Sequence, residues 1–278
     1  MKIGFDAKRA LNNNSGLGNY SRFVIDAVQE YGNDELFLFS PRVDQEHYAK
    51  YANLPGIKVQ LPRYSNKIYS AFWRSYAQVK VFKSLDLDVF HGLSNELPLS
   101  INKSSIRKVV TIHDLIFIRF PELYSTIDRK IYGRKFYQAC LDADQIIAIS
   151  EQTKTDIINY YKVAGSKIKV VYQDCDKQFH KQIVTVEKEE VVKRYSLPNE
   201  FVLSVGTIEP RKNQLNILKA LKGTKVNIVL VGRRTQYQDM LLAFIKENQM
   251  EKRVLFINNV EFRDLPALYN LAAVFVYP

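Results

Sequence analysis

Short apolar runs and longer amphipathic stretches alternate along the whole chain. The short runs are rich in β-branched residues, as in strands buried on both faces. Strand and helix in turn build a parallel sheet, so the pattern predicts an α/β protein. For the first half it predicts strands near 2–6, 35–40, 57–61, 88–91, 107–112, 145–149 and 167–172, and helices near 19–31, 66–84, 124–142 and 151–161, the last capped by Ser150.

A polar segment divides this pattern in two. Residues 176–199 are charged and poor in strand signals, and a new strand, FVLSVG, follows them. We therefore predict two domains, 1–175 and 176–278, with the junction near 176. The second domain repeats the alternation, with strands near 201–206, 226–231, 253–257 and 273–277, and helices near 211–222, 235–248 and 263–271.

The second domain is expected to be incomplete. Its last predicted strand runs almost to Pro278, and no helix follows it. One face of the sheet would then lack its cover, so we expect the printed chain to be truncated at this end.

Composition places the chain among ordinary globular proteins. Apolar residues make up 46% of the 278 residues and charged residues 25%. Cys140 and Cys175 are too few for a disulfide framework and lack the paired spacing of a zinc site, which fits a reducing compartment. No apolar run is long enough for a secretory signal or a membrane span, so we expect a cytoplasmic protein.

The formal charge of +11 raises the question of an anionic partner. The basic residues are spread over both halves and form no recognised nucleic-acid module, so no nucleic acid is expected. The segment 61–85 is basic and aromatic without any acid, and such a helix could lie at an anionic membrane surface. The alternative is an ordinary amphipathic helix with its aromatic rings in the core. The following Asp86 and Asp88 are interpreted as turn residues, not as metal ligands.

Three motifs could carry chemistry, and the first is SGLGNYS at 15–21. Glycines between the first strand and the first helix let backbone amides approach an anion. The segment is only a near match to the dinucleotide fingerprint, because Ser21 stands where a third glycine or alanine belongs. A flexible loop, a dinucleotide loop and an acceptor or phosphate loop all remain open.

The second motif is TIHDL at 111–115, at the carboxyl end of a predicted strand. Ligands bind at that edge of parallel sheets, which makes His113 a candidate. The alternative is a structural histidine held by the neighbouring Asp114.

The third motif is SVGTIEPRKN at 204–213, which runs from a strand through a turn into a helix. Arg211 and Lys212 are expected in the first helical turn, where cations oppose the helix dipole. A bound diphosphate would reverse that cost, because Arg offers a bidentate fork and Lys a mobile point charge. Solvated surface charge is the alternative.

In order, GLGNY, TIHDL, ADQIIAISEQTKTDI and VLSVGTIEPRKN resemble the retaining glycosyltransferases of family 4, from Met1 to Pro278. The likeness is closest to bacterial enzymes that build surface polysaccharides, often from GDP-mannose. It implies the GT-B fold, in which two Rossmann-like domains face each other across a cleft, the first binding the acceptor and the second the donor. It also implies metal-free transfer of a hexose to a glycan or lipid-linked acceptor, with retention of configuration.

The resemblance assigns roles by position. Arg211 and Lys212 would hold the diphosphate and stabilise it as it leaves. His113 would contact the transferred sugar near its anomeric carbon. The residues implied at the donor are Gly16, Gly18, Gly206, Thr207, Arg211 and Lys212.

One part of the family pattern is missing. Relatives carry two glutamates seven residues apart after a strand like AAVFVYP, and the printed sequence ends before that point. We therefore expect this chain to bind nucleotide weakly or not at all, and an inactive nucleotide-binding remnant is one alternative. A nucleotide-sugar epimerase or dehydrogenase is another, since Tyr76 and Lys80 have the Tyr-x-x-x-Lys spacing, although Ser21 breaks the glycine fingerprint.

Overall fold

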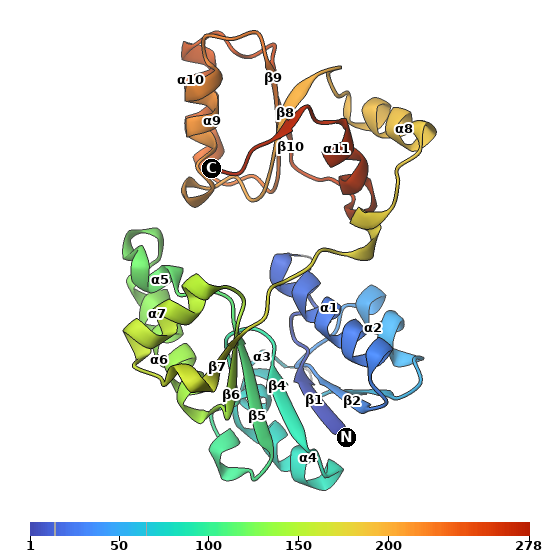
Figure 1. Cartoon of the computed structure of the whole chain (residues 1–278), viewed down its shortest axis with the longest axis vertical. Coiled ribbons are helices and arrows are strands. Elements are labelled where there is room, and N and C mark those ends of the chain that lie inside the picture. Colours follow the sequence, from blue (N-terminus) through green and yellow to red (C-terminus); the bar gives the residue numbers. More distant parts are fainter. Residues whose placement is uncertain (14, 65) are drawn as a thin grey trace. The chain divides into compact units, whose positions relative to one another are not determined.

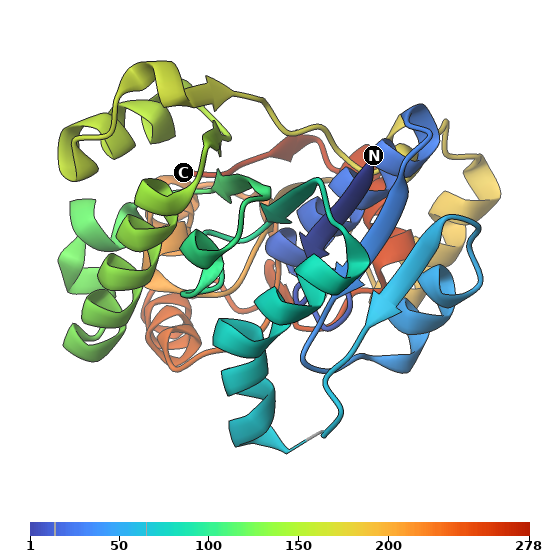
Figure 2. The ribbon, with the colours of Figure 1, turned by 90° about the horizontal axis from the view of Figure 1, so that it is seen from below.

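The computed structural model describes residues 1–13, 15–64 and 66–278, which form two compact units, Met1–Asp174 and Cys175–Pro278. The predicted junction after residue 175 lies one residue from this division. Each unit holds a parallel sheet with helices packed against it, as Figure 1 shows and Figure 2 repeats from below. The α/β prediction is confirmed.

The first unit contains a seven-stranded sheet of order β3-β2-β1-β4-β5-β6-β7, in which every pair is parallel. Strand order reverses between β1 and β4, so this is the switch point at which such sheets bind ligands. The strands are β1 (Lys2–Asp6), β2 (Glu35–Phe39), β3 (Ile57–Gln60), β4 (Val89–Gly92), β5 (Arg107–Ile112), β6 (Gln145–Ala148) and β7 (Ile168–Val170). The helices are α1 (Gly16–Tyr31), α2 (Gln45–Ala52), α3 (Lys67–Phe72), α4 (Gln78–Leu85), α5 (Ile116–Arg119), α6 (Thr126–Asp142) and α7 (Glu151–Tyr161).

Two buried clusters cover the two faces of this sheet. Alternate residues of β2 divide between them: Phe37 and Phe39 join the larger cluster, and Leu36 and Leu38 join the smaller. Successive side chains of a strand point to opposite faces, so this division explains why the strand is apolar at every position. Helices α4, α6 and α7 supply the larger cluster, and α1 and α2 supply the smaller.

The second unit contains a four-stranded parallel sheet of order β10-β9-β8-β11. Its switch point lies between β8 and β11. The elements are α8 (Thr185–Tyr195), β8 (Phe201–Val205), α9 (Gln214–Leu221), β9 (Asn227–Val231), α10 (Tyr237–Glu247), β10 (Val254–Ile257), α11 (Leu265–Leu271) and β11 (Val274–Phe275).

Three sequence predictions need correction. The helix predicted at 66–84 is broken by a π-helical turn, Trp73–Ala77, between α3 and α4. Helices α2 and α8 were not predicted, because both are short, charged and bury few side chains. The helix predicted from 211 begins at Gln214, since Asn213 has a left-handed φ of 56° and ends a preceding 3₁₀ turn.

Other local predictions are confirmed. Helix α7 has the predicted bounds, and Ser150 caps it by accepting a hydrogen bond from the Thr153 amide at 3.1 Å. Asp86 ends α4 with a left-handed φ of 56°, and Asp88 accepts a hydrogen bond from the Lys2 amide at 2.8 Å. Both aspartates are therefore turn and capping residues. Among the described residues no helix has the length and apolar character needed to cross a membrane.

Candidate functional site

His113 lies directly after β5 and is buried, with 7% of its surface exposed. Its Nε2 faces the Leu93 carbonyl at 2.9 Å, and its Nδ1 lies 3.2 Å from the Gln173 amide nitrogen. Since a carbonyl only accepts, Nε2 carries the proton and Nδ1 accepts from Gln173. Burial lowers the pKa of His113, against the raising effects of the Leu93 carbonyl and Asp114, so the ring is neutral at pH 7.

The histidine is therefore satisfied by the protein, though not by the partner expected from the sequence. The Asp114 carboxylate instead accepts a hydrogen bond from the Ile116 amide at 3.2 Å. The backbone of His113 is also fixed, because its amide donates to the Asn95 side chain at 2.7 Å. The predicted contact with a sugar stays a prediction, and through Nδ1 it would require Gln173 to move.

A second buried histidine lies one strand away. His91 Nε2 is 2.9 Å from the Thr111 hydroxyl, which is also 3.1 Å from the Tyr20 hydroxyl. The Tyr20 ring packs edge-on against His113, with centroids 4.6 Å apart. Burial, and the nearby His113, lower the pKa of His91 to about 4. These contacts position the His113 ring through Tyr20.

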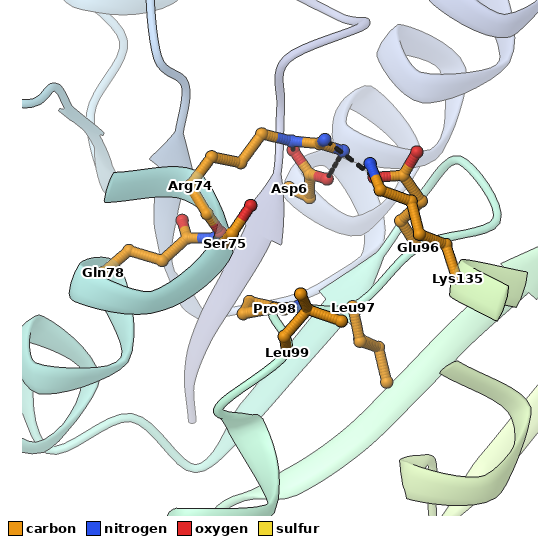
Figure 3. Close-up of a pocket in the computed structure, with 9 residues that line it drawn as sticks. All are labelled: Asp6, Arg74, Ser75, Gln78, Glu96, Leu97, Pro98, Leu99 and Lys135. Carbon is orange, nitrogen blue, oxygen red and sulfur yellow. Dashed lines mark hydrogen bonds and ion pairs between the residues drawn. The ribbon is translucent and has the colours of Figure 1, made fainter. Parts of the chain in front are cut away.

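A buried ion network lies at the switch point itself. Arg74, from the π-helical turn, contacts Asp6 at 2.5 Å and Glu96 at 2.8 Å, and Lys135 lies 3.2 Å from Glu96. Figure 3 shows the Arg74 side chain extended between the two carboxylates. Burial alone would raise the pKa of Glu96, but Arg74 and Lys135 outweigh it and lower the pKa. The network is charge-compensated from within.

The pocket beside this network is small. Its lining residues are Asp6, Arg74, Ser75, Gln78, Glu96, Leu97, Pro98, Leu99 and Lys135 (Figure 3). Its free volume of about 10 Å³ corresponds to roughly one water molecule. A sugar would not fit without movement of the surrounding side chains.

The two predicted glycines of the first unit are helical, which corrects the expectation of a loop. Gly16 begins α1 and Gly18 lies in its first turn. A Cβ on Gly18 would lie 1.8 Å from the Asn13 carbonyl oxygen, whereas a Cβ on Gly16 would meet nothing within 4 Å. Close backbone approach thus explains Gly18. The Gly18 amide already donates to the Ser15 carbonyl at 2.9 Å, so the donors that this helix start can offer to an anion are the amides before it in the first turn.

In the second unit the predicted phosphate turn lies after β8. Pro210–Lys212 form a 3₁₀ turn before α9, so both cations precede the helix. Arg211 pairs with Glu209 at 2.6 Å, and the Lys212 ammonium lies over the Tyr277 ring, 4.6 Å from its centroid, and donates to its hydroxyl. Both cations have partners, but these lie at the surface, where a ligand can compete with them.

The other predicted donor residues hold this turn in place. Gly206 has a φ of +152°, a conformation that glycine adopts most readily. Thr207 contributes its carbonyl, which accepts a hydrogen bond from the Gln214 side chain at 3.1 Å. The next side chain, Ile208, is 1% exposed and anchors the turn in the core.

Two further features do not coincide with the predicted residues. A cavity of about 360 Å³ in the second unit is lined by residues of both charges from around α8 and α11. Among the described residues one group could hold a metal ion: Asp174, Cys175 and His180, with ligand atoms within 4.8 Å of one another. All three are exposed, and they include none of the predicted catalytic residues.

Comparison with known families decides the classification. The model described as Glycosyltransferase Family 4 matches residues 15–176, more than half of the chain. The chain belongs to Glycosyltransferase Family 4. A second model, Glycosyl transferases group 1, matches residues 186–278.

Curated relatives of this family 4 chain include bacterial mannosyltransferases. The O-antigen chain mannosyltransferase B of Escherichia coli is 28% identical over 198 residues, covering 68% of this chain and 50% of the relative. The O-antigen chain mannosyltransferase RfbU of Salmonella typhimurium is 23% identical over 275 residues, covering 95% of this chain and 72% of the relative. The chain thus spans half the length of the Escherichia coli protein.

Solved structures show the fold. The crystal structure of Anabaena Alr3699/HepE in complex with UDP and glucose matches all of this chain and 74% of its own, with a TM-score of 0.71 and 20% identity. The family 4 chain therefore has the two Rossmann-like sheets of the GT-B fold, as predicted.

Sequence reasoning missed the buried network of this family 4 chain. The one sequence feature that could have indicated the network is Asp6, an acidic residue at the carboxyl end of the first strand. Arg74 was assigned to a basic, aromatic surface, but the structure places it in the interior beside Trp73, which is 5% exposed. Trp73 and Arg74 both belong to the π-helical turn, and the hydrophobic pattern of the sequence does not predict such a turn.

Proposed function

We propose that this chain is the part of a retaining hexosyltransferase that binds a nucleotide diphosphate sugar, with GDP-mannose as the first candidate. The hexose passes to a glycan or lipid-linked acceptor in the synthesis of a cell-surface polysaccharide. The observation that carries the proposal is the cationic turn at Arg211 and Lys212, at the switch point of the second sheet, in a family 4 chain. Curated relatives named as O-antigen mannosyltransferases support the choice of sugar.

The proposed chemistry needs no protein nucleophile. The bond between the anomeric carbon and the diphosphate oxygen breaks while the acceptor oxygen attacks from the same face. The departing phosphate takes the acceptor's proton, and Arg211 and Lys212 stabilise the negative charge that develops on it. His113 is neutral and hydrogen-bonded at both ring nitrogens, so it can hydrogen-bond the sugar through Nδ1 only if Gln173 moves, and it carries no charge to it.

The proposal is tested by transfer and by binding. The purified chain is mixed with radiolabelled GDP-mannose and lipid-linked glycan from a bacterial membrane extract, with UDP-glucose as the competing donor. Lys212→Ala should lower product formation about tenfold or more, whereas Lys219→Ala, on the outer side of α9, should leave it within about twofold. EDTA should have no effect if the transfer is metal-free.

The same variants are compared by NMR titration with GDP, so that weak binding is seen even where turnover is slow. Equal GDP affinity for the wild type and Lys212→Ala would remove the diphosphate site from the proposal. Transfer from UDP-glucose but not from GDP-mannose would overturn the choice of donor alone.

We also propose peripheral contact with an anionic membrane through the segment 61–85. The described rings of this segment divide between core and surface: Trp73 is buried, while Phe72 and Tyr76 are 54% and 47% exposed and stack at 5.6 Å. Ile68 is 86% exposed. Ser65 lies outside the described residues. Exposed rings beside lysines suit the headgroup region of an anionic bilayer.

Vesicle co-sedimentation tests this contact. Phe72→Ser with Tyr76→Ser should reduce binding to phosphatidylglycerol vesicles, and Tyr31→Ser, at a more exposed ring elsewhere in the first unit, should not. Equal binding to neutral and anionic vesicles would contradict the electrostatic part of the proposal.

A further inference from the structure

The loop after β9 brings two more arginines to the edge where the phosphate turn lies. Arg233 and Arg234 follow Gly232, the first residue beyond β9. Strands β8 and β9 are parallel neighbours, in register from Phe201 and Asn227 to Val205 and Val231. Their carboxyl ends therefore open on the same edge of the sheet, and the residues that follow them are adjacent (Figure 1).

Backbone contacts fasten this loop to the phosphate turn. Gly232 has a φ of +154°, and a Cβ there would lie 1.8 Å from the Gly206 carbonyl oxygen. The Ile208 amide donates to the Arg233 carbonyl at 3.1 Å, and the Thr235 hydroxyl donates to the Ile208 carbonyl. The position of the Arg233 backbone is thus set by the turn that carries Arg211 and Lys212.

The side chain of Lys212 also packs against Gly206, the residue that the Gly232 backbone contacts. Three of its side-chain carbons lie 3.8 Å from the point that a Cβ on Gly206 would occupy. Gly206 therefore has the stem of Lys212 against its Cα and the Gly232 backbone against its carbonyl. A guanidinium on Arg233 has the length to share an anion with the Lys212 ammonium.

The charges of the turn alone do not balance a diphosphate. Glu209 offsets Arg211 at 2.6 Å, which leaves Lys212 as the uncompensated cation. A sugar nucleotide carries about two negative charges on its diphosphate, so a further cation is needed for complementarity. Arg234 is held by Asp239 at 2.6 Å. In the part of the chain that the structure describes, no ion pair engages Arg233.

We propose that Arg233 is a further anion-binding residue of the donor site, contributing a guanidinium to the diphosphate beside Arg211 and Lys212. This inference rests on the proposed function of the Gly206–Asn213 turn. The ligand that it specifies is a diphosphate rather than a single phosphate, because the second arginine-bearing loop extends the cationic surface from one strand end to the next.

Titration with inorganic pyrophosphate tests the inference on the full chain, observed by amide NMR at low salt. The variants are Arg233→Ala, Arg233→Lys, Arg234→Ala as the matched neighbour, and Lys212→Ala. We expect Arg233→Ala to weaken pyrophosphate binding about five- to tenfold and orthophosphate binding by less than about twofold. Arg233→Lys should recover part of the loss, and Arg234→Ala should stay within about twofold of the wild type.

Each other outcome overturns a defined claim. If Arg233→Ala and Arg234→Ala both bind like the wild type while Lys212→Ala is weakened, the role of Arg233 is wrong and the proposed site stands. If Lys212→Ala also binds like the wild type, or if the wild type binds no pyrophosphate at 20-fold excess over ~1 mM protein, the site and the inference fall together. Unchanged spectra outside the edge of the sheet verify that each variant is folded.

Discussion

The carboxyl edges of the two sheets use charge in opposite ways. In the first unit Arg74 is enclosed by Asp6 and Glu96, and its side chain is 13% exposed. In the second unit Arg211 and its partner Glu209 are each about one-third exposed, and Arg234 and Asp239 more than half. A buried charge must be satisfied by the protein, whereas an exposed one can exchange its partner for a ligand. The first edge therefore holds its cation within the protein, whereas the cations of the second edge are open to exchange with a ligand.

The largest expected effect is on the buried network. Arg74→Met leaves the buried Asp6 carboxylate without its cation and Glu96 with Lys135 alone, and it should lower the stability of the first unit by about 3–5 kcal/mol. Urea unfolding followed by tryptophan fluorescence measures this, because the only tryptophan, Trp73, is buried in the first unit. Lys58→Met, which breaks an exposed pair with Glu35 at 2.9 Å, should cost under about 1 kcal/mol. Equal losses would erase the distinction between buried and exposed charge.

A smaller effect comes from the buried His91. Its folded pKa of about 4 lies below the ordinary value of 6.5, so between these values the unfolded state binds more protons. The stability that the fold gains from keeping His91 neutral is therefore fully present above pH 6.5 and is lost as the pH falls toward 4. Moving from pH 7 to pH 5 should cost the first unit about 2 kcal/mol through this group. The Trp73 signal measures the loss, and His91→Gln should remove most of it. A slope unchanged by that variant would assign the loss to other groups.

Added salt should affect the exposed charges of the second sheet's edge more than the buried charges of the first. Raising sodium chloride from 50 to 500 mM shortens the screening length, which weakens exposed interactions far more than buried ones. Pyrophosphate affinity at the Arg211 and Lys212 turn should fall about three- to tenfold, while the stability cost of Arg74→Met should change little. A cost that halves in high salt would mean that the Arg74 network is open to solvent.

The smallest effect sharpens the picture of the exposed edge. Glu209→Gln releases Arg211 from its partner at 2.6 Å and removes a negative charge from the turn. Pyrophosphate affinity should rise about two- to threefold, and the stability of the second unit should change by less than about 0.5 kcal/mol. Calorimetry and thermal unfolding measure the two quantities. A fall in affinity would indicate that Glu209 positions Arg211 instead of competing for it.

Local signals made much of the fold predictable. Most strands of the first sheet are short segments rich in apolar and β-branched residues, and Ser150 followed by Thr153 marked the start of α7 correctly. Helices α2 and α8 escaped because their stability depends on one or two buried side chains, such as Tyr51 and Val191, rather than on a periodic face.

The site was less predictable because its contacts join distant parts of the chain. Arg74 meets Asp6 across 68 residues and Glu96 across 22, and no local pattern encodes such pairs. The cationic turn and His113 were found because each directly follows a strand, which is a local signal. Their roles in catalysis stay predictions. Arg233 follows a strand too, but its relation to Lys212 depends on the packing of Gly232 against Gly206.

The π-helical turn Trp73–Ala77 determines which side chains of the helical segment 67–85 face the core and which face the solvent. A π turn holds about one residue more than an α turn, so the residues before and after it lie about 100° out of the phase that a continuous α-helix would give them. Within this turn Arg74 reaches the buried carboxylates of Asp6 and Glu96, while the rings of Phe72 and Tyr76 stack at the surface. One surplus residue thus keeps an inward-facing cation and an outward-facing aromatic surface on the same short helix.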